Sequence, residues 1–307
     1  MFTKKQAFLL HALSSVHAGS GSEVGLVDLP IQREKHTGFP KIESSSLKGA
    51  IRAAVRENLK ESTTTVELIF GNEPKKGESE DGQSGAISLS DARILLFPVK
   101  SMRGIFALVT CPHVLQRFVR EMKLYAEDVE LPDISSVYKQ TNGEKPSALV
   151  TSDRLLLNGK LVLDEYTYDA KVDETAQALA RKLAHWLFDD DPSYLTDRLA
   201  ILSDDDFRDF VQLFTEVNAR IHVDANKGTV ESGQLWYEEN VPPETVFYGI
   251  LFVGDVREGQ AKVNSDDSIR EAQEVMEFMK NEKHFPEVFL LGGNSTIGRG
   301  IMRRKWL

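Results

Sequence analysis

Two glycine-rich segments lie near opposite ends of this 307-residue chain, and each directly follows an apolar, strand-like run. The first covers residues 17–34 after the run 7–13, and the second covers residues 292–300 after the run 288–291. Glycine has no Cβ and tolerates positive φ, so such loops can bring backbone N–H groups close to a ligand. In an α+β sheet of the ferredoxin type the first and last strands can be neighbours. The sequence therefore predicts that the two loops meet.

The first loop carries the residues that could perform chemistry. Asp28 lies between the apolar residues Val27 and Leu29, with Pro30 behind it. A carboxylate in this setting is either a turn cap or a catalytic group, and the residues alone leave both interpretations open. His17 lies in the same loop, so His17 and Asp28 could act as an acid–base pair that cleaves an RNA phosphodiester through the 2′-hydroxyl of the RNA itself. A lone aspartate would instead bind a divalent ion or orient that hydroxyl, and a structural role for His17 also stays open.

A second set of candidates could hold a sugar-phosphate backbone. Residues 47–59 have the apolar spacing of a helix, and the serines before them could supply its N-cap. Lys48, Arg52 and Arg56 recur every four residues on another face, which is either a solvated face or a strip that follows phosphates. The second loop is either a tight turn or a grip for sugar-phosphate that reads no bases. Its candidate contacts are Asn294, Ser295, Thr296 and Arg299.

Composition limits the possible classes of protein. The net charge is −10, yet acidic residues crowd residues 189–209, whereas residues 41–60 and 292–307 are basic. A basic groove on an acidic body could still bind a polyanion. The single cysteine, Cys111, excludes an intramolecular disulfide and a cysteine-cluster metal site. No apolar run reaches the length of a membrane helix, so we expect a cytoplasmic protein without a membrane partner.

The remaining pattern predicts a chain of mixed α and β elements. Helices are expected at residues 47–59, 112–122, 173–188, 203–217 and 265–279. Strands are expected at residues 7–13, 86–97, 104–110, 161–172, 220–224 and 288–291. Residues 234–239 and 245–253 are expected to pair as a hairpin around a Pro-Pro connection. Periodicity is lost within residues 125–146, and residues 73–85 have the composition of a mobile loop.

Three motifs, taken together, are similar to a known family. They are His-Ala-Gly-Ser-Gly at 17–21 with Val-Asp-Leu-Pro-Ile-Gln-Arg at 27–33, Ser-Ser-Leu-Lys-Gly-Ala-Ile-Arg at 45–52, and Gly-Gly-Asn-Ser-Thr-Ile-Gly-Arg-Gly at 292–300. In this order they resemble the RAMP superfamily of CRISPR proteins, and within it the backbone subunit of the type III-B (Cmr) effector complex. The resemblance spans nearly the whole chain. It implies an α+β fold, with a modified RRM-like, ferredoxin-type palm, inserted subdomains and a β-hairpin thumb.

The resemblance also implies a domain layout. Residues 1–307 would form a single RAMP-type domain with a mobile loop at 73–85, an irregular insertion or connection at 125–146 and a helical insertion at about 173–218. The thumb would lie either at residues 235–246 or at the loop 73–85.

By the same resemblance, copies of the chain would stack helically along a guide RNA beside other CRISPR effector subunits. Each copy would cut the paired target RNA at a regular interval with a divalent metal, expected to be Mg²⁺. Asp28 would be the cleaving residue and the metal ligand. The guide backbone would be contacted from the helix start and the last loop, by Ser46, Lys48, Arg52, Asn294, Ser295, Thr296 and Arg299.

Three functions stay open on the sequence. The favoured one is a guide-RNA-binding backbone subunit that is also an endoribonuclease. The second is an RNA-binding subunit without catalytic activity, against which the intact Asp28 argues. The third is a stand-alone ribonuclease that matures guide RNA; it would need a histidine-based acid–base pair, for which only His17 is a candidate. A second catalytic carboxylate would come from Glu231, Glu238 or Glu239.

Overall fold

The structure is a computed structural model of the chain. It describes residues 2–59, 63–72, 83–126, 129–140, 147–188, 191–223, 230–257 and 269–307. The expected loop at 73–85 therefore lies almost wholly outside the described residues. Parts of the expected irregular segment at 125–146 also lie outside them, and its described part contains the helix α4 (Ser135–Gln140).

Four long strands form the centre of the main sheet. They are β1 (Lys4–Ala12), β6 (Ala92–Lys100), β15 (Val246–Val253) and β17 (Ile301–Trp306), and they lie in the order β17-β1-β15-β6 with antiparallel neighbours. In the chain, the helix α1 (Ser44–Leu59) lies between β1 and β6, and the helix α8 (Ala272–Lys280) lies between β15 and β17. This β-α-β-β-α-β order is that of the ferredoxin-like palm, so the predicted fold class is confirmed.

Shorter strands extend the palm on both sides. Next to β17 lies the edge strand β16 (Val288–Leu290), while β2 (Lys41–Ile42) and β5 (Ile87–Leu89) pair with β6 and β15. Beyond β6 the sheet continues through β7 (Phe106–Thr110), β12 (Leu199–Ile201), β8 (Ala148–Val150), β11 (Tyr166–Val172), β10 (Lys160–Leu163) and β9 (Leu156–Leu157). The remaining elements are α2 (Thr63–Phe70), β3 (Gly71–Asn72), β4 (Gln83–Ser84), α3 (Pro112–Tyr125), η1 (Asp153–Leu155), α5 (Glu174–Leu187), α6 (Ser193–Thr196), α7 (Asp204–Leu213) and η3 (Ser295–Ile297).

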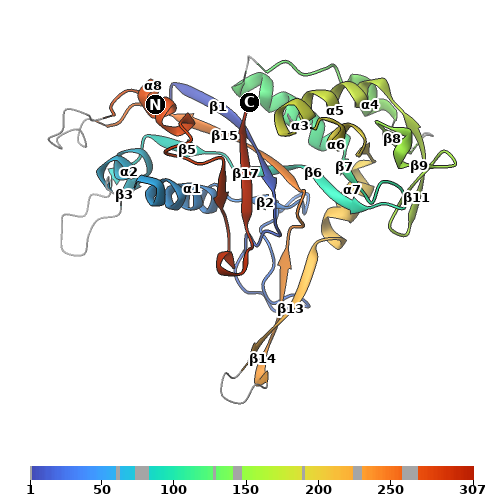
Figure 1. Ribbon diagram of the computed structural model, residues 1–307, viewed down its shortest axis with the longest axis horizontal. Helices are drawn as coiled ribbons and strands as arrows, with labels where there is room; N and C mark the ends of the chain where they lie inside the picture. The colour runs from blue at the N-terminus through green and yellow to red at the C-terminus, as the bar shows by residue number, and fades with distance from the viewer. Residues whose placement is uncertain are drawn as a thin grey trace.

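Helices cover both faces of the palm (Figure 1). Alternate residues of β1 point to opposite faces, and Phe8 and Leu10 meet Ile51 of α1 and Met279 of α8 on one of them. On the other face Phe118 of α3 packs edge-on against Tyr248 of β15, with ring centroids 5.0 Å apart. RRM modules stack bases on an open sheet face. Because helices pack on both faces of this palm, its sheet does not present the open face that an RRM uses.

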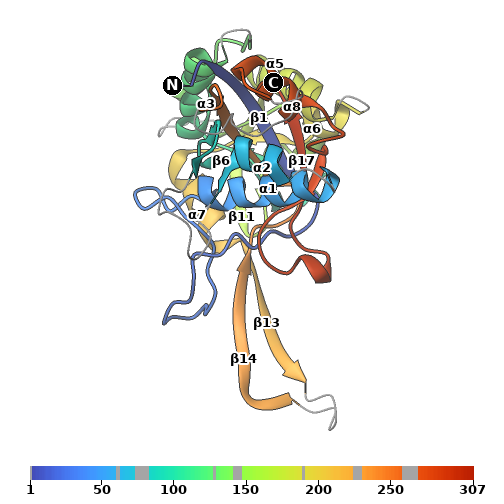
Figure 2. The ribbon, with the colours of Figure 1, turned by 90° about the vertical axis from the view of Figure 1, so that its left-hand side faces the viewer.

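The hairpin of β13 (Glu216–Val223) and β14 (Val230–Asn240) forms a separate two-stranded sheet. Figure 2 shows it extending away from the body, as a thumb would. The predicted pairing of residues 234–239 with 245–253 is wrong, because β14 pairs with β13 and β15 is central between β1 and β6. The buried, apolar β15 belongs inside a sheet, whereas β14 is mostly polar and its residues 234–237 are exposed or half-buried.

Other predicted elements also differ from the structure, and the single strands expected at 86–97 and 161–172 are each two strands. Val217, expected on the buried face of a helix, lies in β13 and is half exposed, because α7 already ends at Leu213. The expected last strand at 288–291 is β16, and β17, which the sequence did not reveal, lies between it and β1. The start of α1 is held by Asp91, whose Oδ1 accepts the Ser44 N–H at 2.9 Å, rather than by a serine cap.

A half-buried polar cluster links β1 and the loop before β15 to the segment that contains α6. His11 Nε2 of β1 lies 2.9 Å from Glu244 Oε2, and the Arg198 guanidinium stacks on the Tyr194 ring. Burial alone would raise the pKa of the Glu244 carboxyl, but contacts with His11, Tyr194 and Arg198 outweigh it and leave that pKa below its usual value.

The lowered pKa of Glu244 predicts an acid-sensitive contribution to stability. A carboxyl whose pKa is lower in the folded state stabilises the protein above its unfolded pKa, and this stabilisation is lost as pH falls through the folded pKa. We expect Glu244→Gln to lower the Tm at pH 7 and to differ less from the wild type below about pH 4. Thermal melts across pH test this, with the exposed Glu165→Gln as control. A Tm difference that does not change with pH would contradict it.

Candidate RNA-binding and cleavage site

The two glycine-rich loops lie against each other, as the sequence predicted. The N–H of Gly300 donates to the Ser15 carbonyl at 2.9 Å, and the N–H of Gly293 donates to the His17 carbonyl at 3.0 Å. Gly292 has a φ of +87°, and a Cβ on it would lie 2.3 Å from the His17 carbonyl oxygen. Only glycine fits this approach. Figure 2 shows both loops at the root of the thumb.

The first loop runs along the outer edge of β14. The N–H groups of Asp28 and Leu29 donate to the Tyr237 carbonyl at 3.1 and 3.0 Å, and the Glu239 N–H donates to the Leu29 carbonyl at 3.0 Å. Successive residues of a strand direct their backbone groups to opposite sides. The backbone groups of Tyr237 and Glu239 therefore bond to the loop, while those of Glu238 between them face β13.

The Asp28 side chain is fixed by this strand but remains accessible. Its Oδ2 accepts the Tyr237 N–H at 2.7 Å, and no described residue donates to its Oδ1. The residue is half-buried rather than sealed in apolar packing. The carboxylate thus has one oxygen anchored and the other available to a ligand.

His17 is held by the same edge of β14. Its Nδ1 lies 2.7 Å from the Glu239 carbonyl oxygen, which can only accept, so Nδ1 carries the proton and Nε2 of the neutral ring is an acceptor. A Cβ on Gly19 would lie 2.7 Å from Nε2, so glycine leaves room for the imidazole. The anchors of His17 and Asp28 are two residues apart, which is about 7 Å along a strand. The structure thus brings the two predicted catalytic residues to one edge.

The neighbouring glutamates have structural partners. Glu239 is buried, and its carboxylate accepts the Ile31 N–H at 3.1 Å, the Thr215 hydroxyl at 2.7 Å and the Arg33 guanidinium. Glu238 is 3% exposed and accepts the Asn294 amide. The side chain of Glu231 lies outside the described residues. Glu239, with its oxygens occupied, supports the loop.

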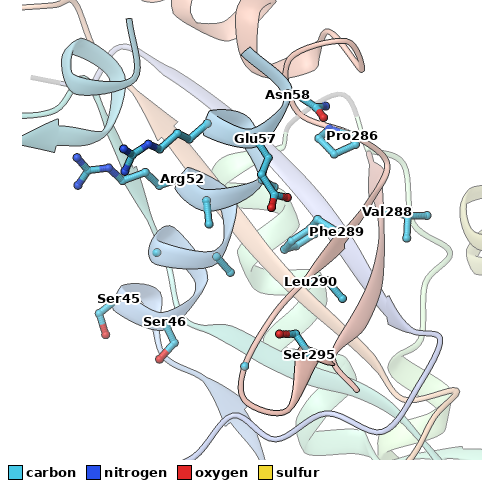
Figure 3. Close-up of a pocket in the computed structure, with 16 residues that line it drawn as sticks. Ser45, Ser46, Arg52, Glu57, Asn58, Pro286, Val288, Phe289, Leu290 and Ser295 are labelled. Atoms are coloured by element: carbon cyan, nitrogen blue, oxygen red, sulfur yellow. The ribbon is translucent and has the colours of Figure 1, made fainter. Parts of the chain in front are cut away.

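A groove of about 1270 Å³ runs between α1, β16 and the second loop (Figure 3). The wall formed by α1 exposes small residues at every fourth position, Ser45, Gly49 and Ala53, beside the cation Arg52. Ser295 lies across the groove in the second loop. Small residues allow a close approach and the nearby cations attract phosphate, so the groove suits a sugar-phosphate chain.

Four of the predicted RNA-binding residues line this groove: Ser46, Arg52, Arg56 and Ser295. Thr296 is exposed next to Ser295 in η3, and Arg299 is half-buried in the same loop, where its N–H donates to the Asn294 carbonyl at 3.3 Å. The structure therefore brings together the helix start and the last loop, which lie about 250 residues apart in the sequence.

Two predicted residues make other contacts. Lys48 does not line the groove, and its Nζ donates to the Ile87 carbonyl at 3.1 Å. Burial, together with the charge of Arg52, lowers the pKa of Lys48 below its usual value. Asn294 donates its amide to Glu238 Oε1 at 2.7 Å.

Gln32 links the groove to the first loop, which sequence reasoning did not anticipate. Its side-chain amide donates to the Gly19 carbonyl at 3.0 Å and to Ser46 Oγ at 2.9 Å, and its oxygen accepts the Glu43 N–H at 2.7 Å. Gln32 is 8% exposed, and nothing in the pattern of the sequence marks it apart from its place behind Pro30. It holds the start of α1 against the loop of Asp28.

The site offers limited ligands for a metal. Among the described residues, no group of three or more histidine, cysteine, aspartate or glutamate side chains could hold an ion. Mg²⁺, however, is commonly bound through one or two carboxylates with waters and substrate phosphates completing its shell. The available Oδ1 of Asp28 has the chemistry of a single carboxylate ligand in a site of this kind.

Comparison with known proteins agrees with this geometry. The family model described as the RAMP superfamily matches residues 9–303. The chain belongs to the RAMP superfamily. A RAMP relative from Pyrococcus furiosus, the CRISPR system Cmr endoribonuclease Cmr4, is 35% identical over 299 residues, which cover 96% of this chain and 92% of the relative.

Solved RAMP structures have the same fold. Oligomeric Cmr4 from Pyrococcus furiosus matches with a TM-score of 0.68 and 26% identity, over 99% of both chains. A chain of the type III-B Cmr-β complex bound to cognate target RNA matches with a TM-score of 0.72 over 99% of this chain and 98% of that one. At 22% identity the second match supports the fold alone. No helix among the described residues has the length and apolar character needed to span a bilayer.

Proposed function

We infer that this RAMP protein is a backbone subunit of a type III-B CRISPR effector complex, which binds guide RNA and cleaves the complementary target RNA. The observation that carries this function is the convergence at β14. The second loop lines the groove through Gly292 and Ser295 and contacts β14 through Asn294, and β14 in turn holds Asp28 and His17. The 35% identical relative, named an endoribonuclease, supports the same activity for this chain.

The guide backbone would lie in the groove. Small residues and Ser295 allow close contact, and Arg52 and Arg56 neutralise phosphates. None of these side chains reads a base edge in a defined way, which suits a protein whose sequence specificity comes from guide–target pairing. The paired target strand would then pass on the side of β14 where Asp28 is displayed.

The geometry supports cleavage through the 2′-hydroxyl of the target. Asp28 would orient this hydroxyl with its available Oδ1, and His17 Nε2 would accept the hydroxyl proton. The 2′-oxygen attacks the adjacent phosphorus, the bond from phosphorus to the 5′-oxygen breaks, and the 5′-oxygen takes a proton from water, giving a cyclic phosphate and a 5′-hydroxyl. A divalent ion, when bound by Asp28, would neutralise charge on the phosphate oxygens.

Assembly would follow from the same function. A protein that follows a guide RNA needs copies of itself joined head to tail, through two different surfaces that do not close into a ring. The solved relative from Pyrococcus furiosus is described as oligomeric. Other effector subunits would complete the complex. The buried, unpaired Cys111 of this chain suits a reducing compartment, so we propose that the protein is located in the cytoplasm.

Cutting by the assembled, guide-loaded complex tests this function. We expect regularly spaced cuts in a complementary RNA, and removal of divalent ions by EDTA should abolish them while the guide stays bound. An RNA that does not pair with the guide is the control and should remain intact. Cutting of free guide precursor by the isolated subunit would instead support the guide-processing alternative, and intact target at every metal concentration would support a scaffold without activity.

A further inference from the structure

We propose that Asn294 is a positioning residue, which couples the guide groove to the cleavage loop through Glu238. This inference rests on the proposed function and deepens it. It gives Asn294 a different task from the guide contact expected from its motif.

The amide of Asn294 is engaged in a contact within the protein. Asn294 adopts a left-handed conformation with a φ of 65°, and its Nδ2 donates to Glu238 Oε1 at 2.7 Å. Glu238 is 3% exposed, so this hydrogen bond is shielded from water. Gly292 and Ser295, which flank Asn294, line the groove. Asn294 therefore lies at the boundary between the groove and the thumb.

Glu238 occupies the position on β14 between the two catalytic anchors. The preceding residue, Tyr237, donates its N–H to Asp28 Oδ2. The following residue, Glu239, accepts a hydrogen bond from His17 Nδ1 through its carbonyl oxygen. Alternate residues of a strand point to opposite faces, so Glu238 holds this segment from the face opposite to the neighbouring side chains. A shift of Glu238 would move both anchors together.

A second contact also links the second loop to the cleavage loop. The N–H of Gly293 donates to the His17 carbonyl, so the second loop holds the cleavage loop by its backbone and β14 by the Asn294 side chain. Seating of the guide against Ser295 would therefore fix the positions of Asp28 and His17.

Asn294→Ala in the full, guide-loaded complex tests this coupling. We expect the single-turnover cleavage rate to fall by about 10-fold or more, since a misplacement of about 1 Å can cost as much as 100-fold. The guide Kd should stay within about twofold of the wild type, because the amide does not face the guide. Asn294→Asp, which keeps the left-handed conformation but sets a second carboxylate against Glu238, should give the same result if the alanine variant folds poorly.

Two further variants separate positioning from other roles. Glu238→Gln keeps an acceptor for Asn294, so we expect its cleavage rate to remain within about threefold of the wild type. Ser295→Ala should weaken guide binding instead, because its side chain lines the groove. Gln273→Ala, on the exposed side of α8, is the control for folding and assembly.

Two results would overturn the proposal. One is an Asn294→Ala complex that loses guide as Ser295→Ala does and cuts normally once loaded. The other is a Glu238→Gln complex as slow as Asn294→Ala, because the Glu238 charge, which also lies 3.8 Å from Arg220 Nη2, would then matter rather than its hydrogen bond with Asn294. Unchanged cutting by an Asp28→Asn complex would contradict the proposed function itself, which is a different outcome from either.

Discussion

Asp28→Asn is expected to abolish target cleavage while leaving guide binding intact. The asparagine amide oxygen can still accept the Tyr237 N–H, so the loop should keep its place on β14. What the variant loses is the negative charge of the available oxygen, which would orient the 2′-hydroxyl and hold a divalent ion. We expect the single-turnover cutting rate of the assembled complex to fall by about 10²–10⁴-fold.

Guide retention and the length of the assembly are the matched readouts for this variant, and both should equal those of the wild type. His17→Ala serves as a comparison, because it removes the proton acceptor without touching the carboxylate and should slow cutting less than Asp28→Asn does. An Asp28→Asn complex that cuts at the wild-type rate would show that the carboxylate takes no part in the reaction.

Glu34→Ala is expected to cause the largest loss of stability. Glu34 and Arg117 are each only 8% exposed, and Arg117 Nη1 lies 2.6 and 2.9 Å from the two carboxylate oxygens. Thr37 also donates to Glu34, at 2.7 Å. Removal of one partner leaves a buried charge without compensation, so the free energy of unfolding should fall by about 3–5 kcal/mol. Denaturant unfolding of the purified chain measures this change.

A surface ion pair provides the control for Glu34→Ala. Asp205 and Arg208 on α7 lie 2.9 Å apart but are largely exposed, so Asp205→Ala should cost less than about 1 kcal/mol. The double variant Glu34→Leu with Arg117→Met should cost less than Glu34→Ala alone, because it removes both charges. Equal losses for Glu34→Ala and Asp205→Ala would show that the buried pair is no more important than a surface one.

The meeting of the two glycine-rich loops could be predicted from sequence because it depends on strand order and backbone shape. Gly292 has a positive φ and approaches His17 closely, and glycine is the residue that tolerates both. A run of glycines in the sequence therefore indicates such a contact. The helix α1 was predictable for a similar reason, since Leu47, Ile51 and Val55 recur with the helical period and are all buried.

The thumb could not be predicted because its pairing is decided by tertiary contacts. A strand was expected at residues 234–239 of β14, yet its partner β13 directly follows α7, where the apolar spacing extended the expected helix to Val217. β15 was expected to pair with the segment before it, but β1 and β6 take both of its edges. Local pattern fixes neither choice.

Side-chain roles at the site were predictable only in part. Ser46, Arg52, Arg56 and Ser295 line one groove, while their contact with RNA stays a prediction. The directions of Lys48 and Asn294 depend on the Ile87 carbonyl and on Glu238, which are distant in sequence. Gln32 carries no local signal, because its importance comes from three partners on separate segments.

Crosslinking from single thiols tests most directly whether the groove holds the guide and Asp28 faces the target. The chain has one cysteine, Cys111, which is fully buried, so Ser295→Cys and Asp28→Cys would each give one accessible thiol. With a thiol-linked photocrosslinker on loaded complexes bound to target RNA, Ser295→Cys should label the guide, and Asp28→Cys should label the target next to the cut positions. Labelling of the same strand from both positions would contradict this arrangement.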